Sequence, residues 1–104
     1  MGYSERLRQR QTELGRPIRI GLVGAGQMGR GYVAQVRRMA GMEVVAIADV
    51  ALDRAGAAFE SVGIDDVVTS ASSDRLERAV DEGRYVITAD AEQLTRLPID
   101  IVVE

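Results

Sequence analysis

The 104-residue sequence contains no cysteine, no histidine and no lysine. Without cysteine, the chain can form neither disulfide bonds nor thiolate metal sites. Without histidine and lysine, it lacks the side chains that most often exchange a proton with a substrate near neutral pH. Only carboxylates, tyrosines and arginines remain for acid–base chemistry, so we predict no catalytic residue and no metal ligand in this chain.

Long hydrophobic runs and a basic surface are also missing. Arginine carries all 13 positive charges, 16 acidic residues are interleaved with them, and the net charge is −3. This balance predicts a mixed surface without affinity for nucleic acid. No apolar run approaches the length of a membrane span, and no secretory signal follows the first methionine. We therefore expect a cytoplasmic protein that binds neither nucleic acid nor membranes.

The sequence does contain a glycine motif, G-x-G-x-x-G, between an apolar run of strand length and a helical pattern. Gly24 permits a tight turn after the strand, Gly26 leaves room for a pyrophosphate, and Gly29 lets the helix lie against the strand. The N–H groups of the first helical turn, with the positive end of the helix dipole, would face bound phosphates. The predicted phosphate-binding residues are Gly24, Ala25, Gly26, Gln27, Met28 and Gly29.

A second apolar run, residues 43–49, ends at Asp49, twenty residues after Gly29. A carboxylate at this spacing can accept hydrogen bonds from the ribose of an adenosine. Arg54 follows five residues later and has two interpretations: a surface residue of the next helix, or a partner for the 2′-phosphate of an NADP-type cofactor. The motif and the acid together predict a dinucleotide cofactor, NAD or NADP, and leave the choice between them open.

The remaining pattern alternates strands and helices. Residues 1–16 predict a leading helix, and residues 17–104 predict a dinucleotide-binding domain. Residues 67–69 could form a short strand, the pattern of Asp90 and Gln93 predicts a capping box for a short helix, and residues 99–103 predict the last strand. Right-handed crossovers would make a parallel sheet with helices on both faces. The predicted fold class is therefore α/β, an incomplete Rossmann-type fold that represents only the amino-terminal part.

These features together resemble the amino-terminal region of homoserine dehydrogenase-like NAD(P)-dependent oxidoreductases. The group most similar carries a later SAF domain and includes deoxyxylulose-phosphate-reductoisomerase-like enzymes. The resemblance rests on residues 15–17, 20–29, 45–49, 86–90 and 99–104. It implies NAD(P) binding at Gly24, Gly26, Gly29 and Asp49, and it places Glu104 near the cofactor or substrate. It also implies that the substrate-binding and catalytic residues belong to a domain missing from this chain.

Three functions fit the sequence. The first is the cofactor-binding portion of an oxidoreductase, inactive alone because hydride transfer needs the missing catalytic domain. The second is a non-catalytic, nucleotide-sensing regulatory module, and the third is a fragment whose site is too incomplete to bind tightly. The free edge of the final strand predicts either self-association through that strand or a low melting temperature.

Overall fold

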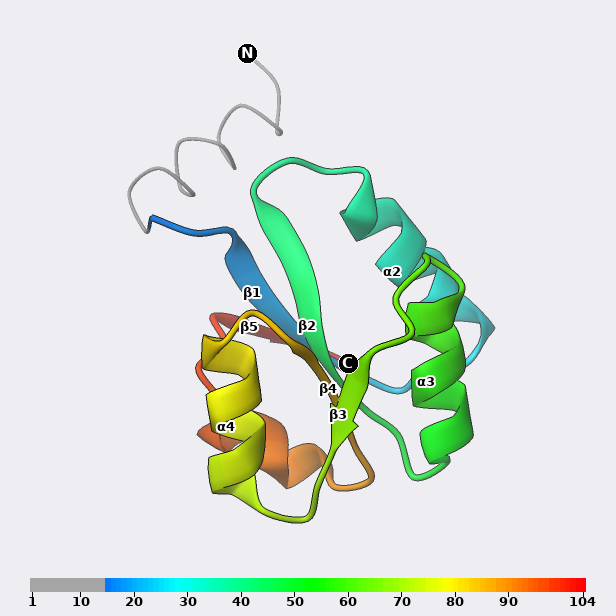
Figure 1. Ribbon diagram of the computed structural model, residues 1–104. Helices are drawn as coiled ribbons and strands as arrows, with labels where there is room; N and C mark the ends of the chain where they lie inside the picture. The colour runs from blue at the N-terminus through cyan, green and yellow to red at the C-terminus, as the bar shows by residue number, and fades with distance from the viewer. Residues whose placement is uncertain (1–14) are drawn as a thin grey trace.

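The apolar run before the glycine motif forms the strand β1 in the computed structural model, which describes residues 15–104. Five strands form one sheet in the spatial order β3-β4-β2-β1-β5, and all neighbouring pairs are parallel (Figure 1). The strands are β1 (Ile18–Val23), β2 (Met42–Ala48), β3 (Val67–Thr69), β4 (Tyr85–Thr88) and β5 (Ile101–Val103). The helices are α2 (Gln27–Arg37), α3 (Leu52–Glu60), α4 (Ser73–Asp81) and the 3-10 helix η1 (Ala91–Arg96). The leading helix predicted over residues 1–16 lies outside the described residues, apart from its last two positions.

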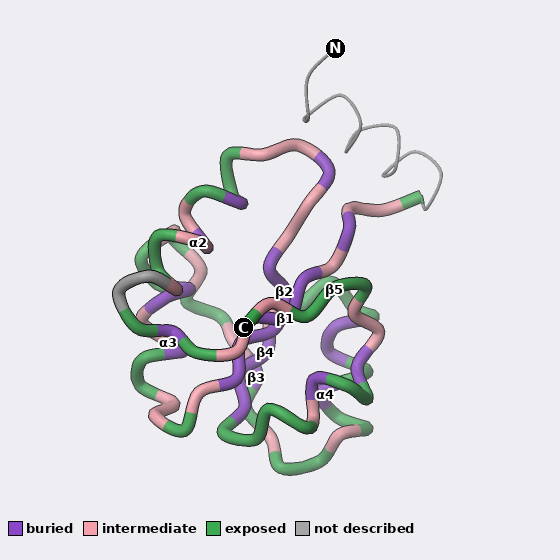
Figure 2. The backbone as a smooth tube through the Cα atoms, turned by 180° about the vertical axis from the view of Figure 1, so that it is seen from behind, coloured by how far each residue is buried: buried purple, intermediate pink, exposed green. Residues whose placement is uncertain are grey.

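Helices cover both faces of the sheet: α2 and α3 lie on one face, and α4 and η1 on the other (Figure 1). Under the first pair, Val33 and Phe59 belong to one buried cluster with Ile47 of β2. Under the second pair, Leu76 and Leu94 belong to another. The central strands β1, β2 and β4 are therefore mostly buried between two layers (Figure 2), and β2 is apolar at nearly every position because helices cover both of its faces. This is the predicted Rossmann-type α/β architecture.

The short segment 67–69 does form a strand, β3, which pairs with β4 at one edge of the sheet. The polar residues after it lead into α4, where the Ser72 hydroxyl accepts a hydrogen bond from the Arg75 N–H. The segment between α3 and β4 therefore contributes both a strand, β3, and a helix, α4. The predicted α/β pattern left open whether residues 67–69 belong to the sheet. The structure shows that they do, and β3 forms its edge beside β4.

Two local predictions were wrong. The capping box of Asp90 and Gln93 does not form: Asp90 accepts the N–H of Glu92, while Gln93 bonds to other elements, described below. The last strand begins at residue 101 and not at 99, because the Ile99 N–H donates to the Leu97 carbonyl in a turn at 2.7 Å. Neither difference moves the carboxyl end of a strand, where the candidate site lies.

Candidate functional site

The turn after β1 has the geometry that the glycine motif predicts. Gly24 has a φ of +91°, a conformation that side chains disfavour, and its N–H donates to the Ala48 carbonyl at 2.7 Å. At Gly29, an added Cβ would lie 2.8 Å from the Gly24 carbonyl oxygen. The backbone of α2 therefore lies directly against the turn, and only glycine permits both the turn and the close approach.

Gly26 is the N-cap residue of α2, whose first turn begins with Gln27 and Met28. No described atom lies within 4 Å of the position that a Cβ on Gly26 would take. Among the described residues, none caps α2 with a side chain, and its first turn contains no acidic residue. The first N–H groups of α2 therefore have no side-chain cap among the described residues and lie beside open space, which is the arrangement that binds a phosphate.

A hollow of about 490 Å³ opens in front of this turn, between α2 and the carboxyl ends of β1 and β5. Its lining residues are Leu22, Val23, Gly24, Gly26, Gly29, Tyr32, Val103 and Glu104. The three motif glycines and Glu104, all predicted from the sequence, thus line one hollow. Tyr32 was not predicted as a site residue, although its position three residues after Gly29 places it on the same side of the helix.

Asp49 does not line that hollow, and its side chain is only 6% exposed. One carboxylate oxygen accepts the Ala25 N–H at 2.9 Å, and the other accepts the Ala51 N–H at 2.8 Å. The hydrogen bond from Ala51 is the largest cause that lowers the pKa of Asp49. Burial acts in the opposite direction, while the Ala25 hydrogen bond and the Arg54 charge lower that pKa further. The carboxylate is therefore charged and already holds two backbone donors.

Arg54 is an exposed residue of α3, as one of its two sequence interpretations predicts, and its role toward a 2′-phosphate stays a prediction. It lies on α3 with its side chain 55% exposed, and its guanidinium is 3.6 Å from the Asp49 carboxylate. The arginine therefore reaches the acid that precedes its helix and remains accessible to a ligand.

A second hollow, of about 320 Å³, lies where the chain leaves β3 and β4. Its lining residues are Leu52, Thr69, Ser70, Ala71, Thr88, Ala89, Asp90 and Gln93. Gln93 holds the two loops together, because its amide nitrogen donates to the Ala71 carbonyl at 2.9 Å and its oxygen accepts the Thr88 hydroxyl. None of these residues was predicted as a site residue. The available signal was the position of polar residues directly after two parallel strands.

A smaller hollow of about 150 Å³ lies at the opposite, amino ends of the strands. Pro17, Met42 and Tyr85 line it, and the Tyr85 hydroxyl donates to the Glu43 carboxylate. Burial, followed by the hydrogen bond to Glu43, raises the pKa of Tyr85. This hollow contains no part of the glycine turn, so we do not include it in the candidate site.

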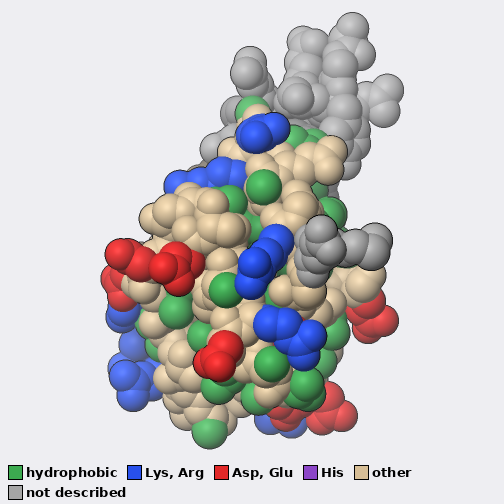
Figure 3. All heavy atoms as spheres, turned by 90° about the vertical axis from the view of Figure 1, so that its right-hand side faces the viewer, with side chains coloured by type: hydrophobic (Ala, Val, Ile, Leu, Met, Phe, Trp, Pro, Cys, Tyr) green, Lys and Arg blue, Asp and Glu red, His purple; other side chains and the backbone are tan. Residues whose placement is uncertain are grey.

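Three further observations concern the surface charge, metal ligands and membrane-spanning helices. On the face viewed in Figure 3, basic and acidic side chains lie among one another, as the mixed composition predicts. Within residues 15–104, no group of acidic side chains is placed to hold a metal ion. No helix in this part of the chain is long and apolar enough to cross a membrane.

Comparison with known proteins adds one similarity. Over 58 residues the chain is 45% identical to inositol 2-dehydrogenase 1 of Paenarthrobacter aurescens (strain TC1). The aligned part is 55% of this chain and 17% of that protein, so the chain spans a small part of its relative. No family model matches the chain. The similarity is to a dehydrogenase in general, and the narrower homoserine dehydrogenase-like group stays a prediction.

Proposed function

We propose that this chain is the NAD(P)-binding portion of an oxidoreductase, in which hydride transfer also requires a substrate-binding domain. The observation that carries the proposal is the uncapped start of α2 behind Gly26, which faces a hollow at the carboxyl ends of parallel strands. In open α/β sheets, ligands bind at this edge, and a helix start without a cap attracts phosphate. Bound there, the nicotinamide would supply the redox chemistry, and the protein would hold and orient it.

Two hollows lie on either side of the glycine turn, which supports a dinucleotide whose adenosine and nicotinamide ends extend in opposite directions. Asp49 directly follows β2, and Leu52, the first residue of α3, lines the second hollow. With the pyrophosphate at Gly26, the adenosine end would extend past Asp49 toward the second hollow. The nicotinamide end would then occupy the larger hollow beside Glu104. Arg54 stands beside Asp49, where a 2′-phosphate would lie, so both NAD and NADP belong to the proposal.

The similarity to inositol 2-dehydrogenase 1 supports an oxidoreductase over other nucleotide-binding functions. The resemblance to homoserine dehydrogenase-like enzymes would narrow the class further, and it rests on the sequence pattern alone. Both agree with a chain that holds a cofactor while its substrate-binding and catalytic residues lie in another domain.

The test compares Gly26→Ala with Gly31→Ala. An added Cβ meets no described atom within 4 Å at either position, so neither substitution creates a clash in the free protein. At position 26 the methyl group would occupy the space proposed for the pyrophosphate. Calorimetric titration with NAD and with NADP should show at least tenfold weaker binding for Gly26→Ala, about 1.4 kcal/mol. Gly31→Ala should bind like the wild type.

Equal affinities of Gly26→Ala and the wild type would contradict the proposed position of the pyrophosphate. If the wild-type chain bound neither cofactor, the proposed function itself would be wrong.

A further inference from the structure

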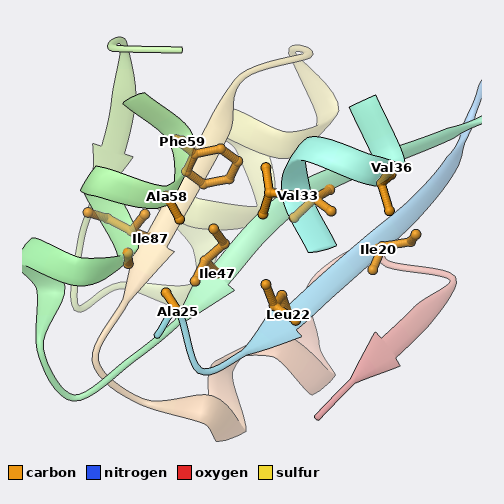
Figure 4. Packing of buried hydrophobic residues seen from close by; sticks show 11 residues of the cluster. Ile20, Leu22, Ala25, Val33, Val36, Ile47, Ala58, Phe59 and Ile87 are labelled. Atoms are coloured by element: carbon orange, nitrogen blue, oxygen red, sulfur yellow. The ribbon is translucent and has the colours of Figure 1, made fainter. Parts of the chain in front are cut away.

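The connection between β1 and α2 is attached to β2 by two consecutive hydrogen bonds. Gly24 donates its N–H to the Ala48 carbonyl, and Ala25 donates its N–H to the Asp49 carboxylate. The methyl group of Ala25 is fully buried and belongs to the cluster that contains Leu22 and Ile47 (Figure 4). Ala25 is thus fixed on one side by packing and on the other by Asp49, directly before Gly26.

The same carboxylate also fixes the start of α3. Its second oxygen accepts the N–H of Ala51, the N-cap residue of that helix, and an alanine offers no side chain that could act as a cap. Asp49 therefore joins the glycine turn to the first residues of α3. Its negative charge lies near the beginnings of two helices, where it is electrostatically favoured.

These contacts limit what Asp49 can offer to a ribose. Each of its oxygens already accepts a backbone N–H, the guanidinium of Arg54 is 3.6 Å away, and the side chain is only 6% exposed. An aspartate that acts only by binding the ribose would instead expose its carboxylate to the ligand. The geometry indicates that Asp49 affects cofactor binding by holding the backbone of the turn in place.

We infer that Asp49 is a positioning residue: it holds the glycine turn in the conformation that receives the pyrophosphate, by bridging Ala25 to Ala51. The inference rests on the proposed function for its effect on cofactor binding, but the bridge itself is independent of any cofactor. A residue with this role serves NAD and NADP alike, because both carry the same pyrophosphate. A residue that only recognises the ribose hydroxyls would favour NAD and repel a 2′-phosphate.

The experiment compares Asp49→Asn with Asp100→Asn. An asparagine at position 49 has one acceptor oxygen and an NH₂ group, so it cannot accept both backbone N–H groups as the aspartate does. Asp100 is a matched control, because it also accepts a backbone N–H, from Arg19, and contacts an arginine, Arg16. It precedes β5 and lies away from the glycine turn, so its replacement should lower stability without altering the turn.

We expect Asp49→Asn to weaken the binding of both NAD and NADP by a similar factor, about tenfold, in calorimetric titrations. Asp100→Asn should lower the melting temperature and leave both dissociation constants within about twofold of the wild type. A loss confined to NAD, with NADP binding unchanged or stronger, would overturn the inference in favour of direct ribose recognition.

A second measurement needs no substitution. In an isotope-labelled wild-type chain, NMR should detect a scalar coupling across the hydrogen bond between the Ala25 amide nitrogen and the Asp49 carboxyl carbon. The Ala25 amide should exchange slowly with solvent. Absence of the coupling together with fast exchange would overturn the bridge, even if Asp49→Asn failed to fold.

The two measurements also separate this inference from the proposed function. If the wild type bound neither cofactor while the coupling was present, the proposed function and the effect of Asp49 on affinity would both be refuted. The bridge would then remain only as a structural contact.

Discussion

Arg16 and Asp100 form a two-pronged ion pair that joins the residues preceding β1 to those preceding β5. The two nitrogen–oxygen distances are 2.8 and 3.1 Å, and the carboxylate also accepts the Arg19 N–H at 2.8 Å. These contacts fix the amino end of the pair β1–β5, while the glycine turn and Glu104 lie at its carboxyl end.

This ion pair predicts a loss of stability in acid. The Arg16 hydrogen bond is the largest cause that lowers the pKa of Asp100, and the Arg19 N–H lowers it further against the effect of burial. A carboxyl group with a lower pKa in the folded state adds stability above its unfolded pKa, near 4, and loses it as the pH falls through the folded pKa. The free energy of unfolding should therefore decrease below about pH 4.

The variant Asp100→Asn checks the contribution of that one carboxylate. Urea unfolding at pH 7 should show a loss of about 1 kcal/mol, because the pair is partly exposed and screened by solvent. Between pH 7 and pH 3, the variant should lose less stability than the wild type. An identical pH dependence of the two proteins would show that other carboxyl groups, such as Asp49, account for the acid sensitivity.

Gly29→Ala should destabilise the fold itself. Its methyl group would lie 2.8 Å from the Gly24 carbonyl oxygen, so α2 would have to move away from the turn. We expect a loss of about 1–3 kcal/mol in the free energy of unfolding. Gly31→Ala, on the exposed side of the same helix, should be neutral or slightly stabilising because alanine favours helices. Equal unfolding midpoints for the two variants would contradict the close approach at Gly29.

Arg54→Ala should affect the two cofactors differently. The guanidinium is exposed and stands beside Asp49, where it would attract the extra phosphate of NADP. We expect NADP binding to weaken several-fold and NAD binding to change little, with a smaller difference at high salt. Arg75→Ala, on α4 across the sheet, serves as the control. An unchanged preference between the cofactors in Arg54→Ala would mean that this arginine does not contact the 2′-phosphate.

The isolated chain should catalyse no hydride transfer. With NAD or NADP and a panel of alcohols and aldehydes, the nicotinamide absorbance should remain constant, because the chain lacks histidine and lysine. Turnover that depends on the chain would contradict this prediction. It would also mean that Glu104, an aspartate or a tyrosine performs the proton transfer.

The isolated chain should also self-associate through β5. This strand pairs with β1, no other described strand pairs with it, and Ile101 and Val102 are 43% and 44% exposed. A free, apolar edge favours pairing with another chain, and a charge there opposes it. Sedimentation should detect oligomers of the wild type and fewer of Val102→Arg.

Cofactor should raise the melting temperature, because a ligand that binds the folded state stabilises it.

The sequence predicted the features that depend on local chemistry. The turn at Gly24 and the approach at Gly29 follow from the absence of a Cβ, so the spacing of the glycines was enough to predict them. The parallel sheet with helices on both faces followed from the alternation of apolar runs with helical patterns, and the structure confirms it.

Which hydrogen-bond partners a polar side chain takes could not be predicted in the same way, because several groups compete for it in the folded protein. The spacing placed Asp49 beside the turn but could not show that two backbone N–H groups occupy its oxygens. The capping pattern of Asp90 and Gln93 failed because Thr88 and the Ala71 carbonyl offered Gln93 hydrogen bonds across two loops. Such choices depend on chain segments that only the folded sheet brings together.

The uncapped start of α2 limits how far this chain can be stabilised without losing the proposed phosphate site. Gly26 already has an extended backbone with a φ of −68°, which a serine could adopt, and a serine hydroxyl could cap the helix. Such a variant would gain a few tenths of a kcal/mol in the free protein and would fill the space proposed for a phosphate. Selection or design for thermostability alone would therefore favour a serine at this position and would remove the proposed phosphate site.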